Sequence, residues 1–352
     1  MNTSCVSPRR RRPIAAMVAV LLAVVSSACS ADSRDSASTV TATVTPDPVV
    51  SSVDQTSAAS ASKTTATAES TTTPSGPRLE QGTVDKLQAV LEAMVVRGSP
   101  DAIAAVITPH GVWAGAAGVD GPNGRRATPQ DEFAISSISK TFTAAAILKL
   151  AEQGTIDLDK PLAGYLGGIT VDSNGATIRQ ALAMYAGLGP TADSVFAEVY
   201  AEVYANPTRV WSADQVVSKI DPRKAAPGTA YEYSNPGYKL VGFAAATANR
   251  MSWSKVVEQT VLDRVGGGRI VVQDAEHPAP EPWALPLADA RGALDLAAYG
   301  QGDALPCLSD ATFSGAAAAM VSDAPSLALW VRELFGGHII EAESSHPETR
   351  VA

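Results

Sequence analysis

The residues Phe133-Ala-Ile-Ser-Ser-Ile-Ser-Lys-Thr-Phe-Thr143 decide the fold of this 352-residue chain. A short apolar piece, 133–135, precedes an apolar pattern that predicts a buried helix ending at Gly154. Ser137 and Lys140 are three residues apart at the start of this helix, so both side chains lie on one face. Because burial favours the neutral form of a lysine, this lysine is suited to act as a base toward the serine hydroxyl.

The Ser-x-x-Lys spacing occurs three times, and the surrounding sequence separates the three matches. The match at Ser60 lies in a polar segment that predicts no fixed structure. Ser252 is placed like a helix N-cap, with Lys255 in solvent. Ser137 alone lies between an extended apolar piece and a buried helix, which favours Ser137 as a nucleophile and Lys140 as its base.

A second reactive element is expected in a loop rich in turn residues and tyrosines, Pro227-Gly-Thr-Ala-Tyr-Glu-Tyr-Ser-Asn-Pro-Gly-Tyr238. It contains Tyr233-Ser-Asn235, and loops held by a scaffold often carry reacting side chains. The same Tyr-x-Asn spacing at Tyr204 and Asn206 directly precedes a proline, so turn formation explains it.

Taken in order, the segments 133–143, 154–162 and 227–235 resemble the serine β-lactamase and penicillin-binding-protein superfamily. The most similar branch holds class C β-lactamases, D-alanyl-D-alanine carboxypeptidases and related esterases. The resemblance covers roughly residues 83–340. It implies an α/β fold in which an antiparallel sheet is flanked by helices, with an all-α subdomain and the site between the two parts.

The resemblance also implies a role for each motif residue. Ser137 is the expected acylated nucleophile, Lys140 its base, Tyr233 the proton shuttle, and Asn235 the amide that orients the substrate. The expected substrate is a β-lactam, a D-Ala-D-Ala peptide derived from peptidoglycan, or a small ester, and no cofactor is expected. The alternative, from a different class, is a catalytically impaired envelope lipoprotein that serves as a binding or scaffolding module.

Two departures from the family pattern affect these expectations. Ala181-Leu-Ala-Met-Tyr-Ala-Gly-Leu188 lacks a His and a Ser that the family usually has there. A third motif, Lys or His followed by a small residue and Gly, is not found after Asn235; the candidates tested were Lys239, Lys255, His277, His338 and His346. With C-terminal strands expected to be missing, we expect residues 79–352 to be marginally stable and to turn over substrates poorly.

Outside these motifs, periodicity predicts a helix over 83–95 that ends at Gly98. The strands 102–108 and 112–119 are expected to form a hairpin, with the second strand left unpaired on its outer edge. Residues 155–330 are expected to form mainly helices and loops.

The N-terminus predicts export. Residues 1–28 combine four arginines with a short apolar stretch and are expected to be a signal peptide, because a membrane span needs about 20 apolar residues. Small residues directly precede Cys29, which is therefore the expected site of lipidation at the bacterial cell membrane; ordinary cleavage nearby is the alternative. Residues 29–78 form the expected disordered tether, and 79–352 the folded domain.

Composition excludes other classes of function. Without residues 1–28 the chain has 23 basic against 36 acidic residues, and a surface this acidic repels nucleic acid. The four histidines have no metal-ligand spacing, so no metal site is expected. The expected contacts are therefore a small or peptidoglycan-derived substrate and, through the lipid anchor only, the membrane.

Overall fold

The computed structural model describes residues 77–120, 125–189, 199, 201–203, 205–206, 208–220, 225–275 and 308–340. All of them belong to one of two compact units of the chain, and the other unit, Val24–Thr71, lies outside the described residues. The expected signal peptide, Cys29 and nearly all of the expected tether also lie outside them. Within the part that the structure describes, no helix is both long and apolar enough to cross a membrane.

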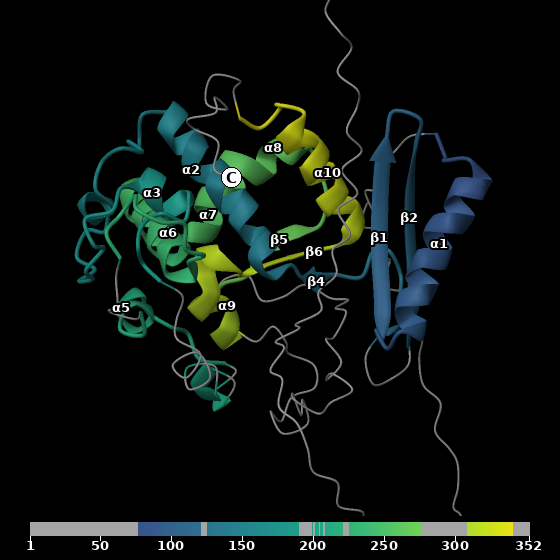
Figure 1. Ribbon diagram of the computed structural model, residues 1–352, viewed down its shortest axis with the longest axis horizontal. Helices are drawn as coiled ribbons and strands as arrows, with labels where there is room; N and C mark the ends of the chain where they lie inside the picture. Colours follow the sequence, from purple (N-terminus) through teal and green to yellow (C-terminus); the bar gives the residue numbers. More distant parts are fainter. Residues whose placement is uncertain are drawn as a thin grey trace, which may run out of the picture. The chain divides into compact units, whose positions relative to one another are not determined.

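The described elements begin with a helix and four strands, continue with a run of helices, and end with two short strands separated and followed by helices (Figure 1). The strands are β1 (Asp101–Thr108), β2 (Gly111–Asp120), β3 (Arg125–Arg126), β4 (Phe133–Ala134), β5 (Ile270–Val272) and β6 (Met320–Ser322). The helices are α1 (Gln81–Val96), α2 (Ser139–Glu152), α3 (Ile178–Leu182), α5 (Ala213–Val217), α6 (Asn235–Asn249), α7 (Trp253–Val257), α8 (Asp263–Val265), α9 (Leu308–Ser314) and α10 (Ala324–Phe335). Short 3₁₀ turns at Ser136–Ile138, Leu162–Tyr165 and Gly315–Ala317 and a π-helical turn at Glu258–Leu262 complete the set.

The predicted hairpin is confirmed. β1 and β2 pair antiparallel from Asp101 opposite Gly118 to Thr108 opposite Gly111, with Pro109 and His110 as the turn. Helices α1 and α10 lie on opposite faces of this hairpin (Figure 1), because its small and apolar side chains need cover on both sides.

The outer side of β2, expected to be unpaired, is paired at both ends of the strand. Val119 and Asp120 pair with β3, and Val112 forms a bridge with Arg78, while β1 and β3 are the edge strands in the sheet order β1-β2-β3. The prediction that β2 lacks a partner on its outer side was therefore wrong at both ends of the strand. Arg125 and Arg126 of β3 pair with Asp120 and Val119, so these polar residues after β2 extend the sheet.

A second antiparallel sheet has the order β4-β6-β5 and was only partly predicted. Its central strand β6 is buried at all three residues, and Val321 pairs with Ala134 on one side and Val271 on the other. Strands of two or three residues are too short to show an alternating pattern. For this reason the expectation of mainly helices and loops over 155–330 missed β5 and β6.

Helix α2 is buried on most of its surface, as predicted, and ends with Gly154 in the left-handed region at φ 73°. On one side of the helix its Phe142 stacks on Trp330, with ring centroids 4.0 Å apart and planes 16° from parallel. Trp330 belongs to α10, and its indole N–H donates to Thr141 Oγ1 at 3.0 Å. This contact fixes the start of α2 against the C-terminal helix.

A buried acidic group lies at the corner of the second sheet, directly before β4. The Glu132 carboxylate accepts from Arg269 Nε at 2.9 Å, while its second oxygen is buried without a hydrogen-bond partner. Burial raises the pKa of Glu132 to about 7, and the nearby Asp323 carboxylate adds to the rise. Near neutral pH, Glu132 is therefore partly protonated, five residues before Ser137.

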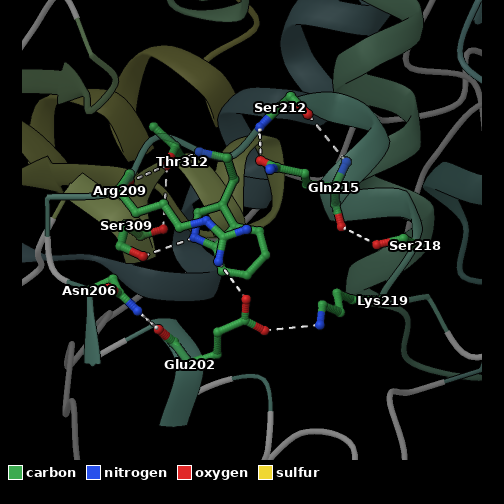
Figure 2. A network of polar contacts seen from close by, with 10 residues as sticks. Glu202, Asn206, Arg209, Ser212, Gln215, Ser218, Lys219, Ser309 and Thr312 are labelled. Atoms are coloured by element: carbon green, nitrogen blue, oxygen red, sulfur yellow. Dashed lines mark hydrogen bonds and ion pairs between the residues drawn. The ribbon is translucent and has the colours of Figure 1, made fainter.

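A network of polar contacts connects the residues around α5 to α9 (Figure 2). The Glu202 carboxylate accepts from Arg209 and from Lys219, and these bonds lower the pKa of Glu202. The Arg209 guanidinium also lies 3.7 Å from the centre of the Trp211 ring, and the Trp211 indole donates to Ser309 Oγ at 2.8 Å. The network therefore joins α5 and its neighbours to α9.

Helix α9 in turn packs against α6 around a buried lysine. Lys239 Nζ lies 3.4 Å from the centre of the Phe313 ring of α9. Burial lowers the pKa of Lys239 to about 7, and the buried carboxylate of Asp310 opposes that shift. Because Lys239 lies one helical turn after Asn235, this contact supports the end of α6 that carries a predicted site residue.

Candidate active site

Ser137 lies in the 3₁₀ turn that leads directly into α2. The residue before it, Ser136, has a positive φ of 44°, which is uncommon for a residue other than glycine and costs energy. Ser137 is exposed, while Lys140, one turn further, is only 6% exposed. The turn thus presents a serine to solvent directly above a buried lysine.

Lys140 Nζ has three oxygen acceptors within hydrogen-bond distance. They are Ser137 Oγ at 3.1 Å, Asn235 Oδ1 at 2.7 Å and the carbonyl oxygen of Ala317 at 2.9 Å. These acceptors come from the 3₁₀ turn before α2, from the first residue of α6 and from the 3₁₀ turn before β6. Burial of the amine lowers the pKa of Lys140 to about 8.

The chemistry of these acceptors decides where the lone pair of a neutral Lys140 points. The Ala317 carbonyl and the Asn235 carbonyl oxygen can only accept hydrogen bonds, whereas the Ser137 hydroxyl can also donate. When Lys140 is neutral, its two hydrogens satisfy the two carbonyl oxygens. Its lone pair is then directed at the Ser137 hydroxyl, which is the arrangement that a general base requires.

Tyr233 approaches the same serine from the loop before α6. Its hydroxyl donates to Ser137 Oγ at 2.7 Å, and its ring centre lies 4.9 Å from Lys140 Nζ. Ser234 fixes this placement as the N-cap of α6, accepting from the Gly237 N–H at 2.9 Å. The four residues predicted from the sequence, Ser137, Lys140, Tyr233 and Asn235, therefore meet at one point.

Sequence reasoning missed two side chains that support this group. Tyr238 is buried, its ring centre lies 5.6 Å from Lys140 Nζ, and its hydroxyl donates to the carbonyl oxygen of Leu182 at 3.0 Å. Burial raises the pKa of Tyr238 above its ordinary value, so it stays protonated. Met184, in the segment that departs from the family pattern, accepts from the Ser234 N–H at 3.1 Å through its sulfur.

The Ala317 carbonyl was also missed, and no signal in the sequence could have found it. Every residue has a carbonyl, so only the fold decides which one faces Lys140. Tyr238, by contrast, lies in the loop that the sequence singled out, and its spacing of three residues from Asn235 places both near one helix face.

The remaining candidates lie elsewhere or outside the described residues. Ser252 is the N-cap of α7, as predicted, and Lys255 is exposed. Asn206 donates its side-chain amide to the Glu202 carbonyl oxygen, while its motif partner Tyr204 lies outside the described residues. The match at Ser60 also lies outside them.

The described candidates for a third motif do not contribute a side chain to this site. Lys239 is buried within α6, and His338 pairs with Glu333 after α10. His277 and His346 lie outside the described residues. Among the residues that the structure describes, no group of three or more His, Cys, Asp or Glu side chains is arranged to hold a metal ion.

Known proteins resemble this chain in sequence. A family model described as Beta-lactamase matches residues 87–350. Protein flp of Staphylococcus aureus (strain N315) is 30% identical over 142 residues, which are 39% of this chain and 27% of that protein. The Beta-lactamase of Pseudomonas fluorescens is 28% identical over 176 residues, 48% of this chain and 46% of that protein. The matches thus span less than half of the length of these curated relatives.

Solved structures extend the likeness over most of the described residues. A D-stereospecific amidohydrolase from Streptomyces sp. is 27% identical with a TM-score of 0.60, covering 73% of this chain and 74% of that one. The D-amino acid amidase from Ochrobactrum anthropi SV3, at 22% identity and a TM-score of 0.61, covers 74% of this chain and 72% of its own. These neighbours confirm the predicted fold of helices around antiparallel sheets.

Proposed function

The chain belongs to the Beta-lactamase family, and from this premise we propose that it is a serine hydrolase that acts by acyl transfer through Ser137. The observation that carries the proposal is the position of Ser137 Oγ, within 3.1 Å of Lys140 Nζ and 2.7 Å of the Tyr233 hydroxyl. A site that only binds a partner has no need for a buried lysine with a lowered pKa beneath an exposed serine.

In the first step Lys140 acts as the general base. Its neutral amine takes the proton of the Ser137 hydroxyl while Oγ forms a bond to the substrate carbonyl carbon, whose oxygen gains the negative charge. With a pKa of about 8, roughly a tenth of Lys140 is neutral at pH 7. The N-terminus of α2, directly after Ser137, contributes a partial positive charge next to the developing oxyanion.

In the second step the bond from carbonyl carbon to leaving group breaks. The Tyr233 hydroxyl gives its proton to the departing nitrogen or oxygen, and the proton held by Lys140 replaces it. The acyl group is then bound to Ser137 as an ester. Attack by water, with its proton taken by the same base, releases the acid and restores the serine.

The neighbours suggest which substrates to test first. One is described as a D-stereospecific amidohydrolase and another as a D-amino acid amidase. We therefore propose small amides of D-amino acids beside β-lactams, D-Ala-D-Ala peptides and esters. These activities differ in how fast water hydrolyses the ester formed on Ser137. For each substrate, both the acylation of Ser137 and the release of the acid are therefore to be measured.

The nucleophile is tested by covalent labelling. We expect a fluorophosphonate or penicillin probe to label Ser137, and Ser137→Ala to reduce labelling at least about 1,000-fold, because among the described residues Ser137 is the hydroxyl hydrogen-bonded to Lys140. The measurement is mass spectrometry of the intact chain and of its peptides. Ser252→Ala, in a second Ser-x-x-Lys match with an exposed lysine, is the matched control and is expected to keep the label.

Undiminished labelling of Ser137→Ala, or a label on another serine in the unmodified chain, contradicts the assignment. Loss of labelling in Ser252→Ala as well would show that both substitutions act through folding. Far-ultraviolet circular dichroism of the three proteins separates that case from a chemical effect.

We also propose that the chain is exported and that Cys29 is lipidated at the cell membrane. Small residues directly precede Cys29, and a short apolar stretch precedes them. We expect the expressed protein to enter the detergent phase on phase partitioning and Cys29→Ala to stay in the aqueous phase. Cys307→Ala is the control and is expected to partition like the parent; equal aqueous distribution of all three proteins contradicts the anchor.

A further inference from the structure

We propose that Tyr185 and Tyr231 form an aromatic wall that binds an aromatic group of the substrate beside Ser137. This inference rests on the proposed function, because it names a substrate class for the same site. Neither tyrosine takes part in the proposed proton transfers. The inference is carried by the position, exposure and mutual arrangement of the two rings.

Two segments that are distant in sequence hold the rings together. The Gly228 N–H donates to the carbonyl oxygen of Tyr185 at 2.7 Å, and the Glu232 N–H donates to that of Met184 at 2.8 Å. The loop before α6 thus runs along the segment after α3. This pairing brings the Tyr185 and Tyr231 ring centroids to 6.0 Å, with the planes at 72° in an edge-to-face arrangement.

The aromatic wall adjoins Tyr233, one of the four residues that meet at Ser137. Tyr231 and Tyr233 are exposed, whereas Glu232 between them is half-buried and Ser234 is buried, so alternate side chains of this loop face opposite directions. The Tyr231 ring therefore follows directly on Tyr233, whose hydroxyl contacts Ser137.

Both rings of the wall are accessible to a ligand. Tyr231 is 58% exposed and Tyr185 is 39% exposed, so each ring keeps part of its apolar surface in water. Tyr185 lies in the segment that departs from the family pattern. A substrate ring packed on this pair removes apolar surface from water and gains aromatic contacts.

Matched thioesters test the proposal and locate the ring. The acyl-side pair is S-ethyl phenylthioacetate and S-ethyl thiobutyrate; the leaving-side pair is S-benzyl and S-ethyl thioacetate. Thiol release is followed with a chromogenic thiol reagent. We expect Tyr185→Ala and Tyr231→Ala to lower kcat/KM about tenfold for the aromatic member of one pair, and less than twofold for the alkyl member.

Conservative variants and a binding measurement complete the test. Tyr185→Phe and Tyr231→Phe keep a ring and are expected to retain the aromatic preference. In Ser137→Ala, which cannot be acylated, we expect phenylacetamide to show saturation-transfer NMR signals that weaken in Ser137→Ala/Tyr231→Ala. This readout separates the two proposals. If phenylacetamide binds Ser137→Ala but the parent protein releases no thiol from any thioester, acyl transfer is refuted while the aromatic wall is supported.

An equal effect of both alanine substitutions on aromatic and alkyl thioesters would overturn the inference, and so would no effect on either. Absence of phenylacetamide binding to Ser137→Ala, in a protein whose Ser137 form hydrolyses alkyl thioesters, overturns it while leaving the proposed function standing.

Discussion

Replacement of Lys140 by methionine is expected to slow acylation of Ser137 by about 100- to 10,000-fold, the usual effect of removing a general base. Methionine keeps much of the length and apolar volume of the lysine, so packing around α2 is largely preserved. It cannot take the proton of the Ser137 hydroxyl. Stopped-flow measurement of the first turnover of a chromogenic lactam or ester isolates this step from release of the product.

The pH profile of the same step provides a second readout. The base is the neutral form of Lys140, and its pKa is about 8. Below about pH 7 the neutral fraction rises about tenfold per unit, so the acylation rate is expected to rise in parallel and to level off above about pH 8. In Lys140→Met the slow residual rate is expected to lack this dependence.

Lys255→Met is the control, because Lys255 has the same Ser-x-x-Lys spacing but lies exposed on α7. Its acylation rate and pH profile are expected to match the parent within about twofold. An unchanged rate and profile in Lys140→Met would remove Lys140 from the mechanism, even if Ser137 is labelled.

The largest effect on stability is expected at Trp330. It is 1% exposed and stacked on the fully buried Phe142, so truncation to alanine removes a large apolar contact and leaves a cavity. Substitutions of this kind cost about 3–5 kcal/mol, a large part of the 5–15 kcal/mol that typically holds a domain folded. We expect urea unfolding of Trp330→Ala to show a much lower midpoint, or the protein to be unfolded without urea.

Phe335→Ala tests whether this cost belongs to the contact or to α10 as a whole. Phe335 lies on the same helix but is 80% exposed, so its truncation is expected to change the free energy of unfolding by less than about 0.5 kcal/mol. Equal midpoints for Trp330→Ala and Phe335→Ala would show that the stacked pair does not stabilise the fold.

Much of this fold was predictable because its decisive elements are long and their patterns local. The hairpin β1–β2 and the buried helix α2 each span enough residues for periodicity to appear. The strands β5 and β6 have three residues each, and they form by pairing with each other and with β4, which are distant in sequence. No local pattern records that kind of tertiary effect.

The residues of the candidate site likewise differ in whether the sequence alone could predict them. Ser137, Lys140, Tyr233 and Asn235 lie in two short segments whose residue types and spacing are visible in the sequence. The Ala317 carbonyl and the aromatic wall depend on which segments meet in space. Tyr185 and Tyr231 were each in a segment that the sequence singled out, but only the backbone pairing beside Met184 brings the rings together.

The hydrogen bonds that α2 makes to distant residues also determine the stage of folding at which Ser137 becomes reactive. Lys140 and Ala317 are 177 positions apart, and Thr143, whose hydroxyl donates to Ala316, is 173 positions from its acceptor. Closing loops of this length is slow compared with forming a helix or a hairpin. During synthesis, Ser137 and Tyr233 therefore emerge well before the carbonyl that orients their base. We therefore expect a chain to react with an acylating substrate only after residues 315–320 have reached α2, because Lys140 lacks the carbonyl that orients it until then.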